Sequence, residues 1–262
     1  MIMFILGTSE GKKFLSLINQ YTDDIIVSTA TAYGGDLLSN YKVKHINTKP
    51  LDKDGLNKLI KDFNIKVLVD ASHPYAEIVS KNAMESCLES NIEYIRYERL
   101  GVLSKESRDN IIRVKSYEEL EEVINNIQGN ILNTTGSKNI EKILKLNIKN
   151  RIIHRILPSW QILKEVLELG VEVSDVVAIK GPIGYELNKG FIYQDNIKAI
   201  ITKDSGAQGG VLEKLKVTID TNIKLIVIEK PEIEYGTVFN REEDIVNYLK
   251  GKYKIKKELG GE

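Results

Sequence analysis

The sequence predicts an α/β fold built from two Rossmann-like, doubly wound parallel-sheet domains with an interdomain cleft. Apolar runs of about five residues alternate with segments of helical period, which is typical of βαβ units. The alternation breaks once, after Arg99, at the polar and aperiodic residues 104–110. A chain of 262 residues is long enough for two domains of similar size. We therefore expect one domain over residues 1–100 and a second over residues 111–251.

In the first domain, the apolar residues before Gly7 predict a buried strand. This run has no basic region before it and is too short to span a bilayer, so we do not interpret it as a signal peptide or a membrane span. Leu56, Leu59, Ile60 and Phe63 have the spacing of a helix that packs on a sheet. Strands are expected at 3–6, 25–29, 43–46, 67–69 and 94–97, and helices at 11–21, 54–63 and 76–90.

The second domain repeats the alternation after the polar stretch. Strands are expected at 111–114, 131–133, 152–155, 175–178, 198–201 and 225–228. Helices are expected at 117–127, 140–145, 160–169, 211–220 and 242–249. Because clefts between domains commonly hold small ligands, we expect the site there.

Composition narrows the class of protein. The 37 basic and 37 acidic residues cancel, which gives no attraction to nucleic acid or to a membrane surface. The single cysteine, Cys87, lies in a helical pattern and is expected to be a buried structural thiol in a reducing, cytoplasmic setting. His45 and His154 fall in expected strands, so no metal site is predicted. Oligomeric state cannot be read from the sequence.

Two strand ends in the first domain predict dinucleotide binding. The loop Gly7-Thr8-Ser9-Glu10 joins the first strand to the first helix, and its glycine and hydroxyls suit a phosphate. The full G-x-G-x-x-G spacing is absent, and Ser9 as a plain helix cap is the alternative. At the second strand end, Ser28 and Thr29 offer only hydroxyls to a ribose, with neither the acidic residue typical of NAD sites nor the arginine typical of NADP sites.

The segment Asp70-Ala71-Ser72-His73-Pro74-Tyr75-Ala76 follows an apolar run and precedes a helix. In open α/β sheets, ligands bind outside the carboxyl ends of the strands. Asp70 could accept from loop N–H groups or from a ribose hydroxyl, and Pro74 would start the helix. Asp, Ser and His lie too close in sequence for a hydrolase relay. The crowding of Asp70, Ser72, His73 and Tyr75 in one turn therefore predicts a ligand site here.

Three strand ends in the second domain also present hydroxyls, glycine N–H groups or lysines. Lysine suits a carboxylate ligand, whereas a solvated surface lysine is the alternative. The expected substrate-binding residues here are Thr134, Thr135, Gly136, Lys180, Gly181, Pro182, Lys203, Ser205 and Gly206.

An ordered set of motifs runs over residues 3 to about 231. It consists of Gly7-Thr8-Ser9-Glu10, Asp70-Ala71-Ser72-His73-Pro74-Tyr75-Ala76, Arg96-Tyr97-Glu98-Arg99, Thr134-Thr135-Gly136, Gly181-Pro182, Thr202-Lys203-Asp204-Ser205-Gly206 and Glu229-Lys230-Pro231. Together these motifs resemble the precorrin-6A and cobalt-precorrin-6A reductases of cobalamin biosynthesis. The resemblance implies that residues 1–100 form a dinucleotide-binding domain and residues 111–251 a substrate domain. It also implies that Asp70, Ser72, His73 and Pro74 contact the cofactor and Tyr75 the substrate. Many members end their second strand in Ser-Leu-Ala-Gly-Arg, whereas this chain has Ser28-Thr29-Ala30-Thr31-Ala32. The missing arginine favours NADH over NADPH.

The resemblance implies a nicotinamide-dependent reduction of one double bond in a tetrapyrrole, (cobalt-)precorrin-6A, to (cobalt-)precorrin-6B. Because the cofactor supplies the hydride, the protein's part is orientation and electrostatics. We therefore expect no indispensable acid–base residue, with His73 and Tyr75 as positioning residues or proton donors. The alternatives are a non-enzymatic NAD(P) sensor, which leaves the second-domain loops without a role, and a cofactor-free tetrapyrrole synthase, which leaves the Gly7 loop as a mere cap.

Overall fold

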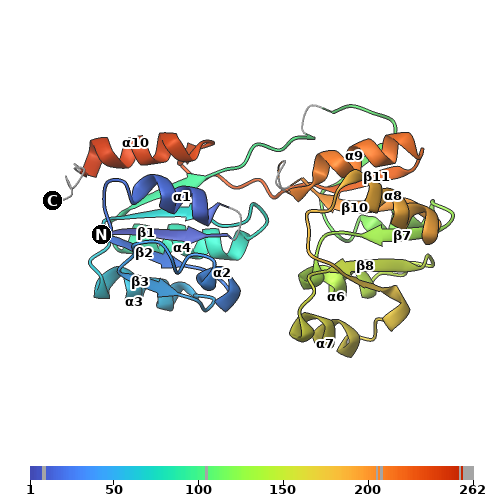
Figure 1. Cartoon of the computed structure of the whole chain (residues 1–262), viewed down its shortest axis with the longest axis horizontal. Helices are drawn as coiled ribbons and strands as arrows, with labels where there is room; N and C mark the ends of the chain where they lie inside the picture. The colour runs from blue at the N-terminus through green and yellow to red at the C-terminus, as the bar shows by residue number, and fades with distance from the viewer. Residues whose placement is uncertain (8–9, 104–105, 205, 207–208, 254, 256–262) are drawn as a thin grey trace. The chain divides into compact units, whose positions relative to one another are not determined.

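The computed structural model describes residues 1–7, 10–103, 106–204, 206, 209–253 and 255. The chain forms two compact units, the first made of residues 1–99 and 232–262 and the second of residues 100–231. Each unit contains one six-stranded sheet, and the strand pairs in both sheets are parallel. The predicted α/β class with two doubly wound parallel sheets is confirmed (Figure 1).

The first sheet has the strand order β12-β5-β4-β1-β2-β3. Its strands are β1 (Ile2–Leu6), β2 (Ile25–Ser28), β3 (His45–Asn47), β4 (Val67–Ala71), β5 (Glu93–Tyr97) and β12 (Thr237–Phe239). The helices of this unit are α1 (Gly11–Ile18), α2 (Ala32–Asp36), α3 (Lys53–Asp62), α4 (Glu77–Glu89) and α10 (Glu242–Tyr253). The sequence did not predict α2 or β12.

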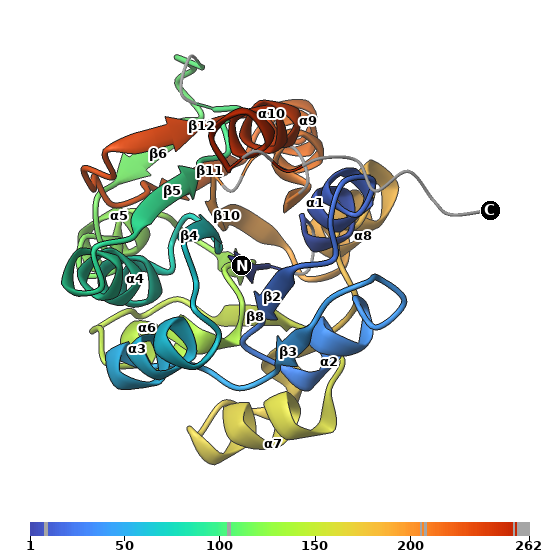
Figure 2. The same cartoon turned by 90° about the vertical axis from the view of Figure 1, so that its left-hand side faces the viewer.

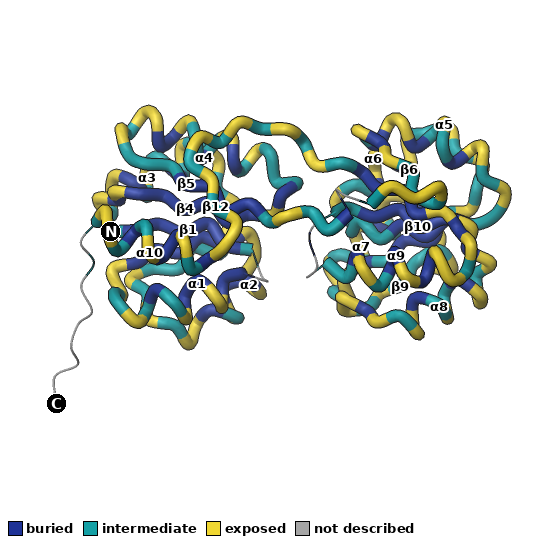
Figure 3. The backbone as a smooth tube through the Cα atoms, turned by 90° about the horizontal axis from the view of Figure 1, so that it is seen from above, coloured by how far each residue is buried: buried dark blue, intermediate teal, exposed yellow. Residues whose placement is uncertain are grey.

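Alternation along β1 explains how helices cover both faces of this sheet. Phe4 packs on one face with Phe14 of α1 and Leu249 of α10. Met3 packs on the other face with Leu56 of α3 and with residues of α4. The two helix layers are visible in Figures 1 and 2, and the strands form the buried centre in Figure 3.

The second sheet has the order β6-β11-β10-β7-β8-β9. Its strands are β6 (Ile111–Val114), β7 (Asn130–Asn133), β8 (Ile152–Ile156), β9 (Val176–Ala178), β10 (Ile197–Lys203) and β11 (Lys224–Ile228). Its helices are α5 (Leu120–Asn125), α6 (Ile140–Leu144), α7 (Trp160–Glu168), α8 (Tyr185–Gln194) and α9 (Val211–Asp220), with short 3₁₀ turns η1 (Ser137–Asn139) and η2 (Val173–Asp175). Helices α8 and α9 pack on one face and α6 and α7 on the other. The sequence did not predict α8.

Asparagines end four of the longer helices. Asn64, Asn91, Asn196 and Asn222 follow α3, α4, α8 and α9 and have φ values of 48, 49, 46 and 52°. Asparagine tolerates this left-handed conformation, which terminates a helix and turns the chain toward the next strand. Each of these helix ends returns the chain to the amino-terminal edge of the sheet on which the helix packs.

The domain boundary differs from the expected one, because residues 232–251 belong to the first unit. Strand β12 pairs with β5, with Thr237 opposite Ile95. The Tyr97 hydroxyl donates to Glu242 of α10 at 3.0 Å. The chain therefore crosses between the units twice, and the edge strands β6 and β12 each follow a crossing. A three-residue strand among charged residues gives too weak a periodicity to be predicted.

Candidate functional site

In each sheet the strand order reverses at one point, which is where α/β folds bind ligands. The reversal lies between β1 and β4 in the first sheet and between β7 and β10 in the second. Gly7 N–H donates to the Ala71 carbonyl at 3.3 Å, and Thr134 N–H donates to the Ile201 carbonyl at 2.9 Å. The structure thus joins the predicted loops in pairs at the two carboxyl edges.

A buried charge network supports the turn after β4. Asp70 is fully buried and forms an ion pair with Arg96 at 3.0 Å. Its carboxylate also accepts from the Ser72 N–H at 2.9 Å, the Ser80 hydroxyl at 2.6 Å and the Tyr94 hydroxyl at 2.7 Å. Burial, and then the Asp70 charge, raise the pKa of Tyr94, so this hydroxyl keeps its proton. Asp70 therefore holds the turn through its own ion pair and hydrogen bonds, and its contact with the cofactor stays a prediction.

Arg96 extends this network along β5. Its guanidinium donates to the Ser72 hydroxyl at 3.1 Å and to Glu98 at 2.9 Å. It also lies 4.9 Å from the ring centre of Tyr235. Ser72 is buried and bonded here, so it too supports the turn, and its contact with the cofactor stays a prediction. Sequence reasoning gave no role to Arg96, although an arginine between Ile95 and Tyr97 in an expected buried strand is a usable signal.

The turn itself exposes His73. The Ala76 N–H donates to the His73 carbonyl at 2.8 Å, and the Tyr75 N–H donates to His73 Nδ1 at 3.3 Å. The two rings lie 5.6 Å apart, with Tyr75 half-buried. Pro74 is buried, beneath the turn rather than at its surface. His73 and Tyr75 are thus the side chains of this turn that can meet a ligand.

The loop after β1 contains a second buried ion pair. Thr8 and Ser9 lie outside the described residues. Glu10 is fully buried and pairs with Arg99, which follows β5. Burial raises the pKa of Glu10, and the Arg99 charge opposes that rise. A Cβ on Gly7 would lie 3.2 Å from the Glu10 carboxylate and 3.8 Å from the Arg99 guanidinium, so the glycine permits this close approach.

The end of β2 is engaged in its own hydrogen bonds. The Ser28 hydroxyl accepts from Asn47 at 3.0 Å, and the Thr29 hydroxyl donates to the Thr31 carbonyl at 3.0 Å. Both residues are buried. Thr31 caps α2 by accepting from the Gly34 N–H at 3.1 Å. Thr31 and Tyr33 are among the exposed positions here, and the expected ribose contacts did not include them.

In the second unit, Asn133 at the end of β7 holds the following turn. Its side-chain oxygen accepts from the Thr135 N–H at 3.0 Å and from the Thr135 hydroxyl at 2.8 Å. Its amide lies 3.0 Å from His154 Nδ1, and burial lowers the pKa of His154 to about 4. Gly136 follows with a φ of 87° and with open space where a Cβ would stand. The turn therefore rests on a neutral, buried histidine.

Lysines gather around Tyr117 at the same edge. The ammonium of Lys142 lies 5.5 Å from the Tyr117 ring centre, and that of Lys203 lies 5.9 Å from it. Burial, then the charges of Lys142 and Lys138, lower the pKa of Lys203 to about 8. Positive charge is therefore concentrated where β10 ends. Lys203 was expected at this edge, whereas the sequence did not single out Lys138 and Lys142.

A further cationic pair lies beneath the loop after β10. Lys214 of α9 is 3% exposed and donates to the Gly209 carbonyl at 2.9 Å. Arg155 of β8 donates to Asn188 at 3.0 Å. Burial lowers the pKa of Lys214 to about 7, with a further contribution from Arg155, and burial lowers the pKa of Arg155 to about 10. Among the described residues, no carboxylate forms an ion pair with either cation.

The remaining expected residues follow the edge strand β9 or belong to the loop after β10 in the second unit. Lys180, Gly181 and Pro182 follow β9 and are exposed, with a cis peptide before the proline. Gly206 is buried with a φ of 83°. Ser205 lies outside the described residues. Lys180 is thus at the sheet margin, apart from the strands where the order reverses.

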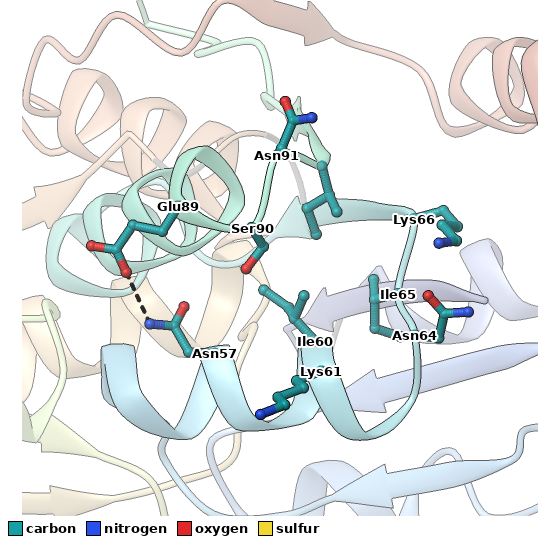
Figure 4. A pocket seen from close by; sticks show the side chains of 10 residues that line it. Asn57, Ile60, Lys61, Asn64, Ile65, Lys66, Glu89, Ser90 and Asn91 are labelled. Atoms are coloured by element: carbon teal, nitrogen blue, oxygen red, sulfur yellow. Dashed lines mark hydrogen bonds between the residues drawn. The ribbon is translucent and has the colours of Figure 1, made fainter.

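Two cavities lie away from these carboxyl edges. One of about 620 Å³ is lined by the ends of α3 and α4 and by the residues that lead into β4 and β5 (Figure 4). Another of about 230 Å³ is lined by residues before β8 and after α7. The described residues contain no group of three or more potential metal ligands. Within the same residues, no helix is long and apolar enough to cross a membrane.

The family model for precorrin-6x reductase CbiJ/CobK matches residues 1–250. The chain belongs to this family. Among curated CbiJ/CobK relatives, it is 38% identical to the cobalt-precorrin-6A reductase of Methanocaldococcus jannaschii, covering 91% of this chain and 92% of the relative. It is 33% identical to the cobalt-precorrin-6A reductase of Priestia megaterium, covering 95% and 98%. The resemblance found in the motifs is confirmed.

A solved structure of CobK precorrin-6A reductase has the same fold. The TM-score is 0.75 at 16% sequence identity, and the match covers 98% of both chains. At that identity the likeness concerns the fold alone. The two-sheet architecture of this CbiJ/CobK chain is therefore a family property that tolerates extensive sequence change.

Proposed function

We propose that this chain reduces one carbon–carbon double bond of cobalt-precorrin-6A, giving cobalt-precorrin-6B, with a nicotinamide dinucleotide as the hydride donor. The match of the reductase family to residues 1–250 carries the proposal. Relatives at 38% and 33% identity are both named for the cobalt-containing substrate, which favours that macrocycle over the metal-free one. The cytoplasm is the proposed location.

The first unit is proposed to hold the dinucleotide at the β1–β4 reversal point. Helix α1 begins there, and no side chain among the described residues caps its first turn. Its N–H groups are thus suited to a pyrophosphate, and the close backbone at Gly7 suits the approach of such a group. Thr8 and Ser9 remain proposed contacts. The Arg99 charge offsets that of Glu10, which lowers the cost of bringing an anion near this carboxylate.

NADH is proposed as the preferred dinucleotide. Residues 28–36, which follow and include the end of β2, contain neither arginine nor lysine. A 2′-phosphate at this position is usually bound by arginine, whereas hydroxyls suit an unmodified ribose. The exposed residue Thr31, together with the backbone around Thr29, supports the binding of an unmodified ribose here.

The second unit is proposed to bind the macrocycle through its acetate and propionate carboxylates. Lys203, Lys138 and Lys142 provide the charge at the end of β10. Arg155 and Lys214 add positive potential under the loop that follows. Thr134, Thr135, Gly136, Gly206 and Ser205 supply hydroxyls and N–H groups, and Lys180, Gly181 and Pro182 form the outer margin. Charge-assisted hydrogen bonds of this kind are among the strongest that proteins make.

Catalysis is proposed to depend on positioning. When bound, the nicotinamide supplies a hydride to one carbon of the double bond, and a proton adds to the neighbouring carbon. Holding two reactants in contact supplies roughly 7–11 kcal/mol of barrier lowering without an acid–base group. His73 and Tyr75 line the turn after β4, where they orient the nicotinamide ring or pass a proton from solvent.

The test is anaerobic turnover with four reactant pairs. Cobalt-precorrin-6A and metal-free precorrin-6A are each mixed with NADH or NADPH, and loss of the reduced dinucleotide is followed by absorbance. We expect oxidation of NADH by the cobalt macrocycle, with a kcat/KM at least about tenfold higher than for NADPH. A preference for NADPH would show that the absence of an arginine after β2 does not select NADH.

Binding measurements separate the alternatives. Fluorescence titration with NADH should show binding, whereas a cofactor-free synthase would show none. Binding without oxidation of NADH by either macrocycle would instead establish a dinucleotide sensor. Either result would overturn the proposed reductase.

A further inference from the structure

The crossing from the first unit to the second joins two anchored loops. Arg99 is the last residue of the first unit, and its ion pair with Glu10 ties it to the loop after β1. Val102 and Leu103, just inside the second unit, donate their N–H groups to the two oxygens of Asp204, at 3.0 and 2.8 Å. Asp204 follows Lys203 directly in the loop after β10.

The anchor on the second unit is closely fitted. A Cβ on Gly101 would lie 2.6 Å from an Asp204 oxygen, so a side chain at this position would displace the carboxylate. Leu103 is fully buried in the core of the second unit. Arg113 also donates to the Leu103 carbonyl, and to the Glu106 carbonyl at 3.1 Å. The segment after Leu100 is thus fixed from both sides.

Little chain separates the two anchors. Three peptide units connect Arg99 to Val102, a span of roughly 11 Å even when fully extended. The return crossing is longer between two such contacts, because six peptide units connect Glu229, bonded to the Val114 carbonyl at 2.8 Å, to Tyr235, which lies against Arg96 of the first unit. The link between the two anchors is therefore too short to absorb much of a displacement of Arg99, and the displacement reaches Asp204.

We propose that Gly101 and Asp204 are positioning residues that couple the loop after β1 to the loop after β10, so that dinucleotide and macrocycle bind with positive cooperativity. This inference rests on the proposed function. A pyrophosphate beside Gly7 attracts the Arg99 guanidinium and fixes its position. The short crossing passes that restraint to Asp204, which holds Lys203 and Gly206 in the form that binds carboxylates. By linkage, the macrocycle strengthens dinucleotide binding by the same factor.

The test measures a coupling factor by titration calorimetry. The Kd of the oxidised form of whichever dinucleotide supports turnover is measured with and without saturating cobalt-precorrin-6A, so that no reaction occurs. We expect the macrocycle to tighten wild-type dinucleotide binding at least about fivefold. Inserting one glycine between Leu100 and Gly101 keeps both anchors but lengthens the link, and should reduce the factor below about twofold with each separate affinity little changed.

Matched variants distinguish coupling from general damage. Gly101→Ala should also abolish coupling, whereas Gly190→Ala, where a Cβ meets open space, should not. A glycine inserted between Glu232 and Ile233 in the return crossing should leave the factor intact. Because Asp204→Ala removes the clashing carboxylate, Gly101→Ala should add nothing to it.

The outcomes separate this inference from the proposed function. Wild-type protein that shows no turnover with either macrocycle refutes the function. Wild-type protein that turns over but shows a coupling factor of one refutes the inference alone. A factor that survives the insertion after Leu100 also refutes it.

Discussion

The carboxyl edges of the two sheets have the same topology but opposite electrostatics. In the first unit the buried carboxylates Asp70, Glu98 and Glu10 are each paired with an arginine. In the second unit burial depresses the pKa of Lys203 to about 8 and that of Lys214 to about 7. At the first edge two arginines hold three buried carboxylates in ion pairs, whereas at the second edge burial disfavours the charged form of the lysines.

This difference indicates how the two edges meet their ligands. In the proposed function, the ion-paired first edge presents the N–H groups of α1 and the His73 turn to the dinucleotide. At the second edge burial disfavours the charged lysines, and the carboxylates of the proposed ligand would favour their charged form. Sites of this second kind trade folded-state stability for binding. Mutations at the two edges should therefore affect stability with opposite signs.

The largest expected effect is the loss of Arg96. In Arg96→Met, Asp70 and Glu98 remain as buried charges without their partner, which should lower the free energy of unfolding by about 3–5 kcal/mol. Urea unfolding followed by far-UV circular dichroism measures this loss. The single tryptophan, Trp160, lies in α7 of the second unit, so its fluorescence reports that unit separately.

The control for Arg96 is an exposed pair in the same unit. Lys81 pairs with Glu77 at 3.4 Å on the surface of α4. Lys81→Ala should change the free energy of unfolding by less than about 0.5 kcal/mol. If Arg96→Met cost as little as this control, the first edge would not depend on its buried pairing.

At the second edge, Lys203→Met should weaken macrocycle binding without lowering stability. Losing a charge-assisted contact of about 1.5–3 kcal/mol raises the KM for the tetrapyrrole by roughly 10- to 150-fold. The free energy of unfolding should stay constant or rise, because the depressed pKa shows that burial disfavours the charged form. Steady-state kinetics and urea unfolding measure the two quantities.

Lys198→Met is the matched control, since Lys198 is exposed near the start of the same strand, β10. It should leave the KM for the tetrapyrrole unchanged. Equal effects of the two substitutions would mean that charge at the carboxyl edge has no special role. A clear loss of stability in Lys203→Met would contradict the contrast between the edges.

Much of this architecture could be predicted from the sequence, and the failures have physical causes. Apolar runs identified most strands because parallel strands are buried on both faces. The motif order identified the family, and strand ends identified the loops. The return of the chain to the first unit after residue 231 was not predicted, because β12 has three residues, two of which are only half-buried. Such a strand is defined by pairing with β5, which is a long-range contact.

The roles of individual site residues were harder to predict. Asp70 and Ser72 lie in the predicted turn, and both contact Arg96, a partner that the motif did not indicate. Which side of a strand a polar residue faces depends on one step of register, which a motif does not reveal. Lys214 was missed because a lysine in an amphipathic helix ordinarily faces solvent, whereas here it is 3% exposed.

His73 should affect catalysis less than Lys203 affects binding. In His73→Ala, turnover should fall by less than about 10²-fold, the lower end of the general-acid range, with the KM for NADH little changed. The turn is held from below by Asp70, so its backbone should survive the substitution. A larger loss of kcat with intact dinucleotide binding would establish His73 as the proton donor.

The smallest expected effect is a difference in pH dependence between the two substrates. Lys203 loses its proton as pH rises through about 8, so kcat/KM for the tetrapyrrole should fall by up to about tenfold per pH unit above that value. The kcat/KM for NADH should stay flat, because the carboxylates of the first edge are already paired. Stability should move the other way. A lysine whose folded pKa lies below its unfolded value of 10.5 binds fewer protons when folded between about 8 and 10.5, so stability rises with pH there.

Lys203→Arg assigns this titration to one residue. A guanidinium keeps its proton throughout the range, so the fall in kcat/KM near pH 8 should disappear. A weaker slope from about pH 7 should remain, because the pKa of Lys214 is lowered to about 7. Suppose that kcat/KM for the tetrapyrrole still fell near pH 8 in Lys203→Arg, and that kcat/KM for NADH fell equally. The titrating group would then lie outside the cationic edge. The opposite electrostatics of the two edges would then have no kinetic consequence.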